Sequence, residues 1–306
     1  MKNVDLAKLL RIRAHTPRAR LPEKIFFDLD VNQKHLTLKL SKECLGKNMQ
    51  DNAGAFESWA LVLKYYLSDM IDTVTIDWED IKEEDKDPHF NRFVYRLDKF
   101  LKTYGWVQTY KELPDIPAIL RCNCPIVREA ASEEKFKENS EGKLESEYVK
   151  SNSANYDYMN HQFPVGLFDE KKSKTTRYTP GNKSAIDIWA IKEKQFFIFE
   201  LKKDDNKPLG IISEILFYTN VIIDLFHEKI LFEKKGNEFS NALDNNARGF
   251  RYFYDYLKNV NPKTVTPILL ANNIHPIIST ELLEFVNDSP RWRELSVCFS
   301  KQTLNK

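Results

Sequence analysis

The sequence is poor in cysteine and glycine and contains no long apolar run. No stretch approaches the roughly 18 apolar residues that a membrane-spanning helix needs, so we expect no membrane association. The first residues include no apolar core of signal-peptide length, and we therefore expect a cytoplasmic protein. Four cysteines in 306 residues are too few for a disulfide scaffold. Cys122 and Cys124 form a C-x-C pair, but no second pair follows to complete a zinc site.

The chain has no excess of either charge. Lys and Arg total 46, and Asp and Glu total 45. This balance argues against a broadly basic nucleic-acid coat protein, but it permits an enzyme whose basic residues are local. The sequence also lacks a G-x4-GK[ST] phosphate loop, and its histidines form no H-x3-H pattern. These absences argue against an NTP-driven motor and a histidine-based metal site.

The length suggests two domains, at about 100–200 residues for each. The best boundary is the charged stretch Ser132–Glu147, which follows Pro125. We expect an N-terminal mixed α/β domain over residues 1–130, with an unknown role in substrate or partner binding. A second domain is expected over residues 131–306.

Apolar periodicity predicts helices and strands in both halves. The N-terminal half has a predicted hairpin over Lys24–Leu40 and helices over Ala55–Ile71 and Phe90–Trp106. In the C-terminal half, strand patterns alternate with helical patterns, which predicts a mixed α/β sheet covered on both faces. The helices expected there are Glu133–Lys150, Leu209–Phe226, Asn241–Val260 and Thr280–Asp288, and the strands are His161–Phe168, Ser184–Ile191, Gln195–Lys202, Thr264–Asn273 and Leu295–Lys301.

Three charged residues are expected to meet on the hairpin formed by the second and third of these strands. A turn centred on Glu193 and Lys194 places Asp187 directly opposite Glu200, with their Cβ atoms about 4.5–5.5 Å apart. Lys202 shares their face because side chains in a strand repeat every two residues. The other face is apolar, so a slip of one residue would bury the charges in the core. Its residues are Ile186, Ile188, Ala190, Phe197, Phe199 and Leu201.

Two adjacent carboxylates repel each other and need a proton, a cation or a metal. Lys202 supplies one positive charge against two negative charges, and a hard divalent cation would complete the balance. Such a cation can polarise a phosphodiester and activate a water, while Lys202 could orient that water or neutralise transition-state charge. The alternative is a buried salt bridge without a metal. The E-x-K spacing alone is unspecific, since it recurs at Glu141 and Glu233, but only the copy at Glu200 ends an apolar strand.

Together, this order of elements and these residues resemble the PD-(D/E)xK, or restriction-endonuclease-like, nuclease superfamily over Glu133–Lys301. The resemblance implies an αβββαβ core and hydrolysis of phosphodiesters with Mg²⁺ or Mn²⁺. Asp187 matches the first metal-binding acid, although Ile186 stands where the family name has proline. Glu200 matches the second acid, and Lys202 matches the motif lysine.

The resemblance also points to residues on the flanking helices. Members often add a glutamate on the helix before the first strand, and the candidates are Glu145 and Glu147. We favour Glu145 as a third metal ligand, because it lies nearer the apolar face of that helix. Some members place Gln and Tyr at i, i+4 on the helix after the motif. Glu214 and Tyr218 hold this spacing, but Glu214 could equally pair with a buried lysine.

Basic residues near the motif could contact nucleic acid. Lys203 directly follows it, and a loop between the first two strands carries a basic cluster; phosphate contact and simple solvation are both open for these residues. Arg248 and Arg251 lie among aromatic residues that either stack on bases or fill the core. The loop cluster consists of Lys171, Lys172, Lys174 and Arg177.

These patterns lead to two hypotheses. The first is a metal-dependent nuclease acting on nucleic acid, with DNA favoured over RNA and a homodimer possible because cutting two strands suits two sites. The second is a catalytically inactive protein of the same fold that binds nucleic acid or protein. The presence of Asp187, Glu200 and Lys202 together favours the first hypothesis.

Overall fold

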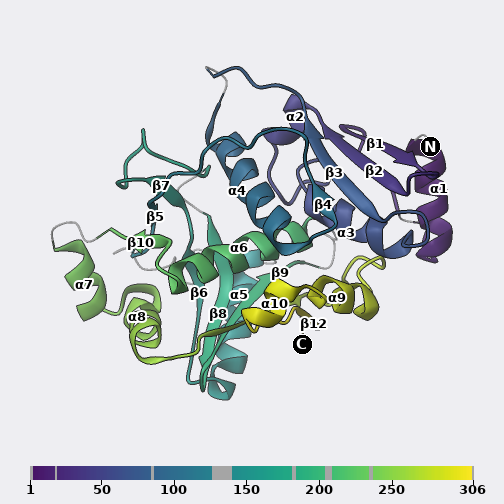
Figure 1. Cartoon of the computed structure of the whole chain (residues 1–306). Coiled ribbons are helices and arrows are strands. Elements are labelled where there is room, and N and C mark those ends of the chain that lie inside the picture. The colour runs from purple at the N-terminus through teal and green to yellow at the C-terminus, as the bar shows by residue number, and fades with distance from the viewer. Residues whose placement is uncertain are drawn as a thin grey trace. The chain divides into compact units, whose positions relative to one another are not determined.

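The computed structural model describes residues 3–17, 19–83, 86–125, 140–180, 184–203, 209–233 and 237–304 (Figure 1). Within these residues, no helix combines the length and the apolar character needed to cross a membrane. The chain forms two compact units that interleave along the sequence. The first unit contains Met1–Ile116, Asn206–Glu214 and Asn273–Glu294, and the second contains Pro117–Asp205, Ile215–Asn272 and Leu295–Lys306. Two segments beyond residue 130 therefore belong to the first unit.

The first unit contains a four-stranded sheet in the order β1-β2-β3-β4. Strands β1 and β2 form the predicted antiparallel hairpin, and the remaining pairings are parallel. Side chains of β1 are alternately buried and exposed, so one face of this strand packs inward. The strands are β1 (Ile25–Asp30), β2 (His35–Leu40), β3 (Thr73–Trp78) and β4 (Val107–Gln108).

Aromatic contacts hold α3 and α4 against this sheet. The rings of Phe27 in β1 and Trp59 in α3 have centroids 6.3 Å apart, and those of Trp78 in β3 and Phe93 in α4 are 5.4 Å apart. Asp87 caps α4 by accepting a hydrogen bond from the Phe90 amide at 2.9 Å. The helices of this unit are α1 (Asn3–Arg13), α2 (Lys42–Leu45), α3 (Phe56–Tyr66), α4 (Pro88–Thr103), α9 (Thr280–Asn287) and α10 (Pro290–Glu294).

Gly210, just before α6 (Ile211–Phe226), packs against the backbone of the first unit. A Cβ added there would lie 2.6 Å from the Met49 carbonyl oxygen and would also collide with the carbonyl of Gln50. We expect Gly210→Ala to destabilise the protein by about 1–3 kcal/mol, because backbone atoms must move to admit the methyl group. Urea unfolding measures this change. Gly105→Ala is the matched control, since a Cβ at Gly105 meets nothing within 4 Å, and equal losses from both variants would contradict the explanation.

The second unit contains a five-stranded mixed sheet in the order β12-β11-β9-β8-β6. The β6–β8 and β8–β9 pairings are antiparallel, whereas β11 runs parallel to both β9 and β12. The predicted mixed α/β class is therefore confirmed. These strands are β6 (Tyr158–Pro164), β8 (Ala185–Lys192), β9 (Gln195–Leu201), β11 (Thr264–Leu270) and β12 (Ser300–Gln302), and a smaller sheet contains β5 (Leu120–Cys122), β7 (Leu167–Asp169) and β10 (Ile230–Phe232).

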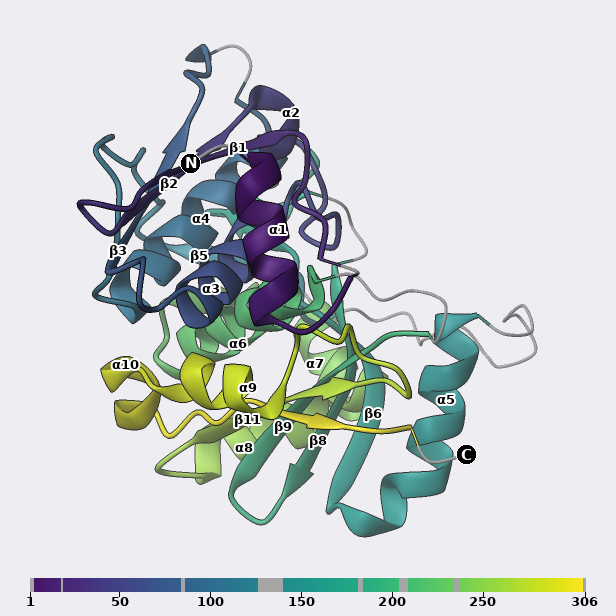
Figure 2. The same ribbon diagram turned by 90° about the vertical axis from the view of Figure 1, so that its right-hand side faces the viewer.

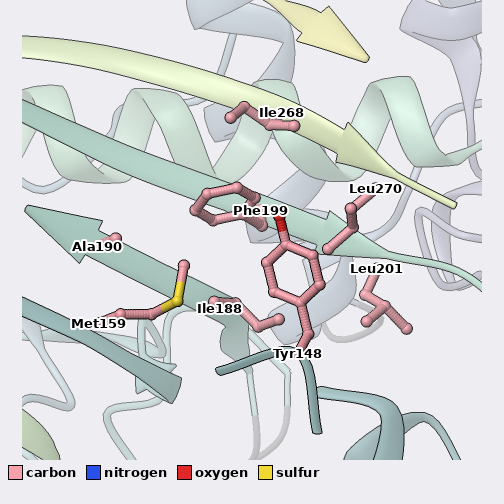
Figure 3. Packing of buried hydrophobic residues seen from close by; sticks show 8 residues of the cluster. All are labelled: Tyr148, Met159, Ile188, Ala190, Phe199, Leu201, Ile268 and Leu270. Atoms are coloured by element: carbon pink, nitrogen blue, oxygen red, sulfur yellow. The ribbon is translucent and has the colours of Figure 1, made fainter. Parts of the chain in front are cut away.

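Both faces of the five-stranded sheet are covered. Helix α5 (Glu141–Asn152) packs on one face through Tyr148, and Figures 1 and 2 show this helix beside the sheet. On the other face, Trp189 and Phe196 contact Phe253 of α8 (Phe250–Asn259), and Phe196 also contacts Phe226 of α6. The cluster under α5 contains Tyr148, Met159, Ile188, Ala190, Phe199, Leu201, Ile268 and Leu270 (Figure 3).

Two predicted elements differ from the observed ones. The strand predicted over His161–Phe168 is divided between β6 and β7, which lie in different sheets. The helix predicted over Asn241–Val260 is broken into α7 (Glu238–Asp244) and α8, because left-handed residues separate them. At Gly249, with φ 78°, a side chain would lie only 2.7 Å from Trp189, so close packing excludes any larger residue there.

Candidate active site

The β8–β9 hairpin has the predicted register. Its ladder runs from Ile188–Phe199 to the turn, where Glu193 takes a left-handed backbone with φ 55°. The ladder ends one residue before Asp187 and Glu200. The apolar face of the hairpin fixes this register by packing beneath α5, as Figure 3 shows. Asp187 and Glu200 therefore follow directly on the last paired residues of the hairpin.

Asp187 is anchored at the end of β9. Its carboxylate Oδ2 accepts a hydrogen bond from the Leu201 amide at 2.9 Å, while the residue remains half-buried. This bond replaces the regular pairing of the strands at that point and holds the carboxylate across the hairpin. Asp187 thus combines a fixed position with partial access to solvent.

Glu200 and Lys202 form a buried ion pair. The Lys202 Nζ lies 2.7 Å from the Glu200 Oε1, and the two residues are 3% and 1% exposed, respectively. The backbone amide of Lys202 donates to the Leu270 carbonyl at 3.0 Å, which continues the pairing with β11 beyond the end of β9. A charge this deeply buried requires a partner, because its desolvation is costly. Lys202 supplies that partner for Glu200.

Glu145 faces inward from α5, as the helical wheel predicts. It is 3% exposed, whereas Glu147 is exposed. Gln162 of β6 donates through its side-chain Nε2 to the Glu145 carboxylate at 2.5 Å, and the Nδ1 of His161 lies 3.7 Å from the same carboxylate. The sequence prediction missed Gln162 and His161. The available signal was that both are polar in a predicted strand, His161–Phe168, whose other residues are apolar.

The described part of the chain contains no group of three or more His, Cys, Asp or Glu side chains placed to hold a metal ion. The structure therefore does not gather Asp187, Glu200 and Glu145 around one point. Cys122 and Cys124 are buried free thiols. Burial raises the pKa of Cys122 to about 12 and that of Cys124 well above its ordinary value, so both favour the protonated form that binds metals poorly.

The basic residues of the predicted loop differ in exposure and in the contacts that they make. Lys171 and Lys174 are exposed, whereas Lys172 is half-buried with its Nζ 3.4 Å from the Asn123 carbonyl. Arg177 forms an isolated antiparallel bridge with Phe168. Lys171 also lines a cavity of about 560 Å³, and the charged residues around it include equal numbers of bases and acids. They are Arg121, Lys171, Lys258, Glu170, Glu228 and Glu233.

The remaining predicted residues have different positions. Glu214 and Tyr218 are both buried on α6, but Glu214 is assigned to the first unit and Tyr218 to the second. Lys203 is half-buried directly after Lys202. Among the aromatic residues near the two arginines, Phe250, Phe253 and Tyr256 are buried, so they fill the core.

Arg248 and Arg251 differ in their contacts. Arg248 is half-buried and donates through Nη1 to the Gln162 carbonyl at 3.1 Å. Arg251 is exposed and donates to the Leu243 carbonyl at 2.8 Å. Arg248 therefore contacts the strand that carries Gln162.

Comparisons of the chain with protein-family models, with curated proteins and with solved structures gave no match. Asp187, Glu200, Lys202 and Glu145 all belong to the second unit.

Proposed function

We propose that the second unit is a metal-dependent nuclease that hydrolyses phosphodiester bonds, with DNA favoured over RNA as the substrate. The observation that carries the proposal is the 2.7 Å ion pair between Lys202 and the buried Glu200 at the end of β9, beside the hydrogen bond from the Leu201 amide to Asp187 of β8. We infer that the three side chains share one site. An apolar sheet would be more stable without these charges, so we attribute them to function.

The topology supports a restriction-endonuclease-like core. The order α5, β6, β8, β9, α6, β11 corresponds to αβββαβ, and the four core strands are neighbours in one sheet. Asp187 lies on the second core strand and Glu200 near the end of the third, followed two residues later by Lys202. These are the positions that the PD-(D/E)xK motif requires. The order of the elements and the positions of the three charged residues both support the proposed nuclease.

The acids present suit a hard divalent cation. Mg²⁺ is commonly held by only one or two carboxylates, with waters and substrate phosphates as its other ligands. Asp187 and Glu200 are the pair that we propose for this role. We propose Mg²⁺ or Mn²⁺ as the cofactor and Glu145 as a further acid of the site. A bound cation polarises the phosphodiester and favours deprotonation of a water.

The chain's own residues would perform the other steps. The Lys202 ammonium would stabilise negative charge on the phosphate as the water attacks. Glu200 holds that ammonium in place through the ion pair. Lys203 and the basic loop are proposed to contact backbone phosphates, and a homodimer would supply a second site for the other strand.

An inactive binding protein of the same fold is the second candidate. One observation favours it: the Lys202–Glu200 pair already gives the buried Glu200 carboxylate a cation without a metal. Cleavage of supercoiled plasmid with Mg²⁺ or Mn²⁺ separates the two candidates, with single-stranded DNA and RNA as further substrates. Cleavage by the wild type and not by Glu200→Ala supports the nuclease. Absence of both cleavage and divalent-cation binding would favour the binding protein.

Asp187→Asn should separate metal binding from folding. The amide oxygen can still accept from the Leu201 amide, but one of the two adjoining negative charges is lost. Without metal, we expect the melting temperature to rise by about 2–4 °C, which corresponds to relief of about 1 kcal/mol of repulsion. We also expect Mg²⁺ to stabilise the wild type and not the variant. Thermal unfolding with and without Mg²⁺ tests both points, and equal stabilisation of the two proteins would exclude Asp187 from a metal site.

A further inference from the structure

A cavity of about 560 Å³ lies within the second unit, and its lining includes none of the four candidate catalytic residues. Its walls come from β5, from the residues that follow β7, from β10 and its flanking residues, from α8 and from the end of α6. Small-molecule pockets in proteins span about 300–1,000 Å³ and combine apolar walls with a few polar groups. The cavity therefore has room for an organic molecule rather than for a single ion.

Apolar side chains form much of the cavity wall. Leu225, Ile230 and Phe232 are buried, whereas Leu231 and Leu257 are half-buried. The half-buried side chains keep apolar surface that a ligand can cover. Covering it favours binding, because apolar area is removed from water.

The ring of Tyr254 has a fixed orientation at this cavity. It packs edge-on against Phe239, with ring centroids 5.4 Å apart, and its centroid lies 6.4 Å from that of Phe232. The Lys258 Nζ lies 5.6 Å from the centroid of the Tyr254 ring. The ring is neutral, so this contact leaves the positive charge of Lys258 uncancelled. A ring held in this way can pack against a flat ring of a ligand.

Arg121 is held at the cavity by two main-chain carbonyls. Its Nε donates to the Glu170 carbonyl, and its Nη1 donates to the Phe232 carbonyl at 3.2 Å. The parallel register of β5 with β10 places Arg121 opposite Leu231, so an arginine and an apolar side chain share one face of the sheet. Carbonyls are neutral and do not cancel the charge of the guanidinium, which has further N–H donors for an anion. Carboxylates and phosphates accept such donors in pairs.

The acids at the cavity permit an anion and offer a second type of contact. Glu170 and Glu228 are exposed, so water weakens their repulsion of an anion. Glu233 is half-buried, and its carboxylate Oε2 accepts a hydrogen bond from the Lys172 amide at 3.0 Å, which fixes its position. A fixed carboxylate can accept hydrogen bonds from hydroxyl or amino groups of a ligand. The cavity thus combines an anion-binding arginine, an aromatic ring and a carboxylate acceptor.

We propose that this cavity binds a small organic anion in which a phosphate or carboxylate is joined to a ring system that carries a hydroxyl or amino group. Arg121 binds the anionic group, Tyr254 packs against the ring, and Glu233 accepts from the hydroxyl or amino group. Nucleoside monophosphates and hydroxylated aromatic carboxylates share this chemistry. The proposal does not depend on the nuclease function, because none of these three residues belongs to the candidate active site.

Isothermal titration calorimetry of the full chain with AMP and with 4-hydroxyphenylacetate tests the proposal. We expect at least one of them to bind, and its neutral counterpart, adenosine or 4-hydroxyphenylacetamide, to bind about 10–100-fold more weakly, because the charge-assisted hydrogen bonds from Arg121 are lost. Binding of AMP alone supports a nucleotide as the ligand, and binding of 4-hydroxyphenylacetate alone supports an aromatic carboxylate. If neither anion binds at millimolar concentration, or if the neutral compounds bind equally well, the proposal is overturned.

Arg121→Lys tests where the anion binds. This variant keeps a positive charge but loses the planar guanidinium, so we expect the anion to bind about tenfold more weakly and the neutral counterpart to change little. Arg251→Lys is the matched control and should bind as the wild type does, because Arg251 is exposed on α8 and lies outside the cavity lining.

Leu257→Glu keeps the proposal testable if Arg121→Lys does not fold. It adds an acid to the cavity wall at a half-buried position of α8, and we expect it to weaken binding of the anion by a similar factor. Thermal unfolding shows whether each variant is folded. Wild-type affinity for the anion in either folded variant would overturn the proposal.

Discussion

Lys202→Met is expected to lower metal-dependent cleavage by about 10²–10³-fold and to destabilise the protein by about 3–5 kcal/mol. The two losses have different causes. Under the proposed nuclease function, cleavage falls because the ammonium no longer stabilises charge on the phosphate. Stability falls because Glu200, 1% exposed, loses the cation 2.7 Å from its Oε1. Plasmid cleavage rates and urea unfolding of the full chain measure the two losses.

A second variant separates these losses. Glu200→Gln combined with Lys202→Met removes both buried charges, so we expect it to regain most of the lost stability while remaining inactive. Lys203→Met is the matched control, because it removes a half-buried lysine directly beside Lys202. It should weaken DNA binding at most and leave kcat nearly unchanged. Full cleavage by Lys202→Met would contradict the proposed role of the ammonium, and a stability loss in the double variant as large as in Lys202→Met would contradict the role of the ion pair.

The hairpin at the site could be predicted because its sequence determines its register locally. Apolar residues alternate along both strands, and only one register buries them all on one face. The pairing of Ile188 with Phe199 and of the residues up to the turn could therefore be predicted without any information from distant parts of the chain. The inward position of Glu145 followed in the same way from helical periodicity.

The contacts around Gln162 could not be predicted, because they depend on distant residues. Its left-handed backbone follows from no local preference, since glutamine favours ordinary strand angles. The conformation is accompanied by a hydrogen bond from Arg248, which is 86 residues away in the sequence. The contact with Glu145 is also non-local. Sequence periodicity predicts which face a side chain occupies, but not which distant partner it meets.

The interleaving of the two units along the sequence could not be predicted either, because it also depends on contacts between residues that are distant in the sequence. Asn206–Glu214 and Asn273–Glu294 follow the predicted boundary at residue 130 but belong to the first unit. Their assignment reflects specific contacts, such as the three hydrogen bonds between Ser58 and Ser213. Charge patterns along the chain do not reveal contacts of this kind. The strand Thr73–Trp78, by contrast, could have been predicted from its sequence. Val74 and Ile76 alternate with polar residues, and the sequence prediction overlooked this local signal.

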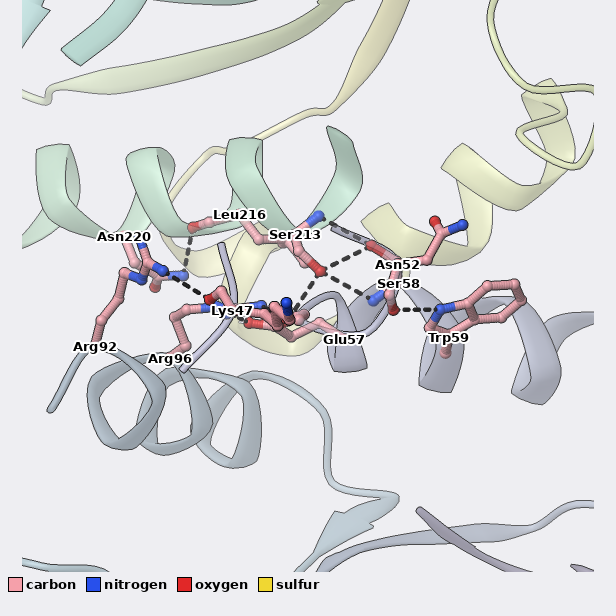
Figure 4. Close-up of polar contacts among 11 residues, drawn as sticks. Lys47, Asn52, Glu57, Ser58, Trp59, Arg92, Arg96, Ser213, Leu216 and Asn220 are labelled. Atoms are coloured by element: carbon pink, nitrogen blue, oxygen red, sulfur yellow. Dashed lines mark hydrogen bonds and ion pairs between the residues drawn. The ribbon is translucent and has the colours of Figure 1, made fainter. Parts of the chain in front are cut away.

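Arg96→Met should destabilise the first unit by about 3–5 kcal/mol, since it leaves Glu57 buried without its cation. Arg96 donates through Nε to the Glu57 carboxylate at 2.8 Å and through Nη2 to the Gly54 carbonyl at 2.8 Å. The Ser213 hydroxyl donates to the same carboxylate at 2.9 Å (Figure 4). This network joins α3, α4 and the segment that precedes residue 215.

Arg13→Met provides the comparison for this prediction. Arg13 also pairs with an acid, Asp69, at 2.7 Å, but the two side chains are 46% and 55% exposed. An exposed pair contributes about 1 kcal/mol or less, because water screens it and already solvates both groups. Urea unfolding of both variants should therefore show a loss several times larger for Arg96→Met than for Arg13→Met. Similar losses would mean that Glu57 finds another partner or water when Arg96 is removed. A large difference would show that the buried ion pair between Glu57 and Arg96 stabilises the first unit. The Ser213 hydroxyl, from a distant part of the chain, contributes a hydrogen bond to the same carboxylate.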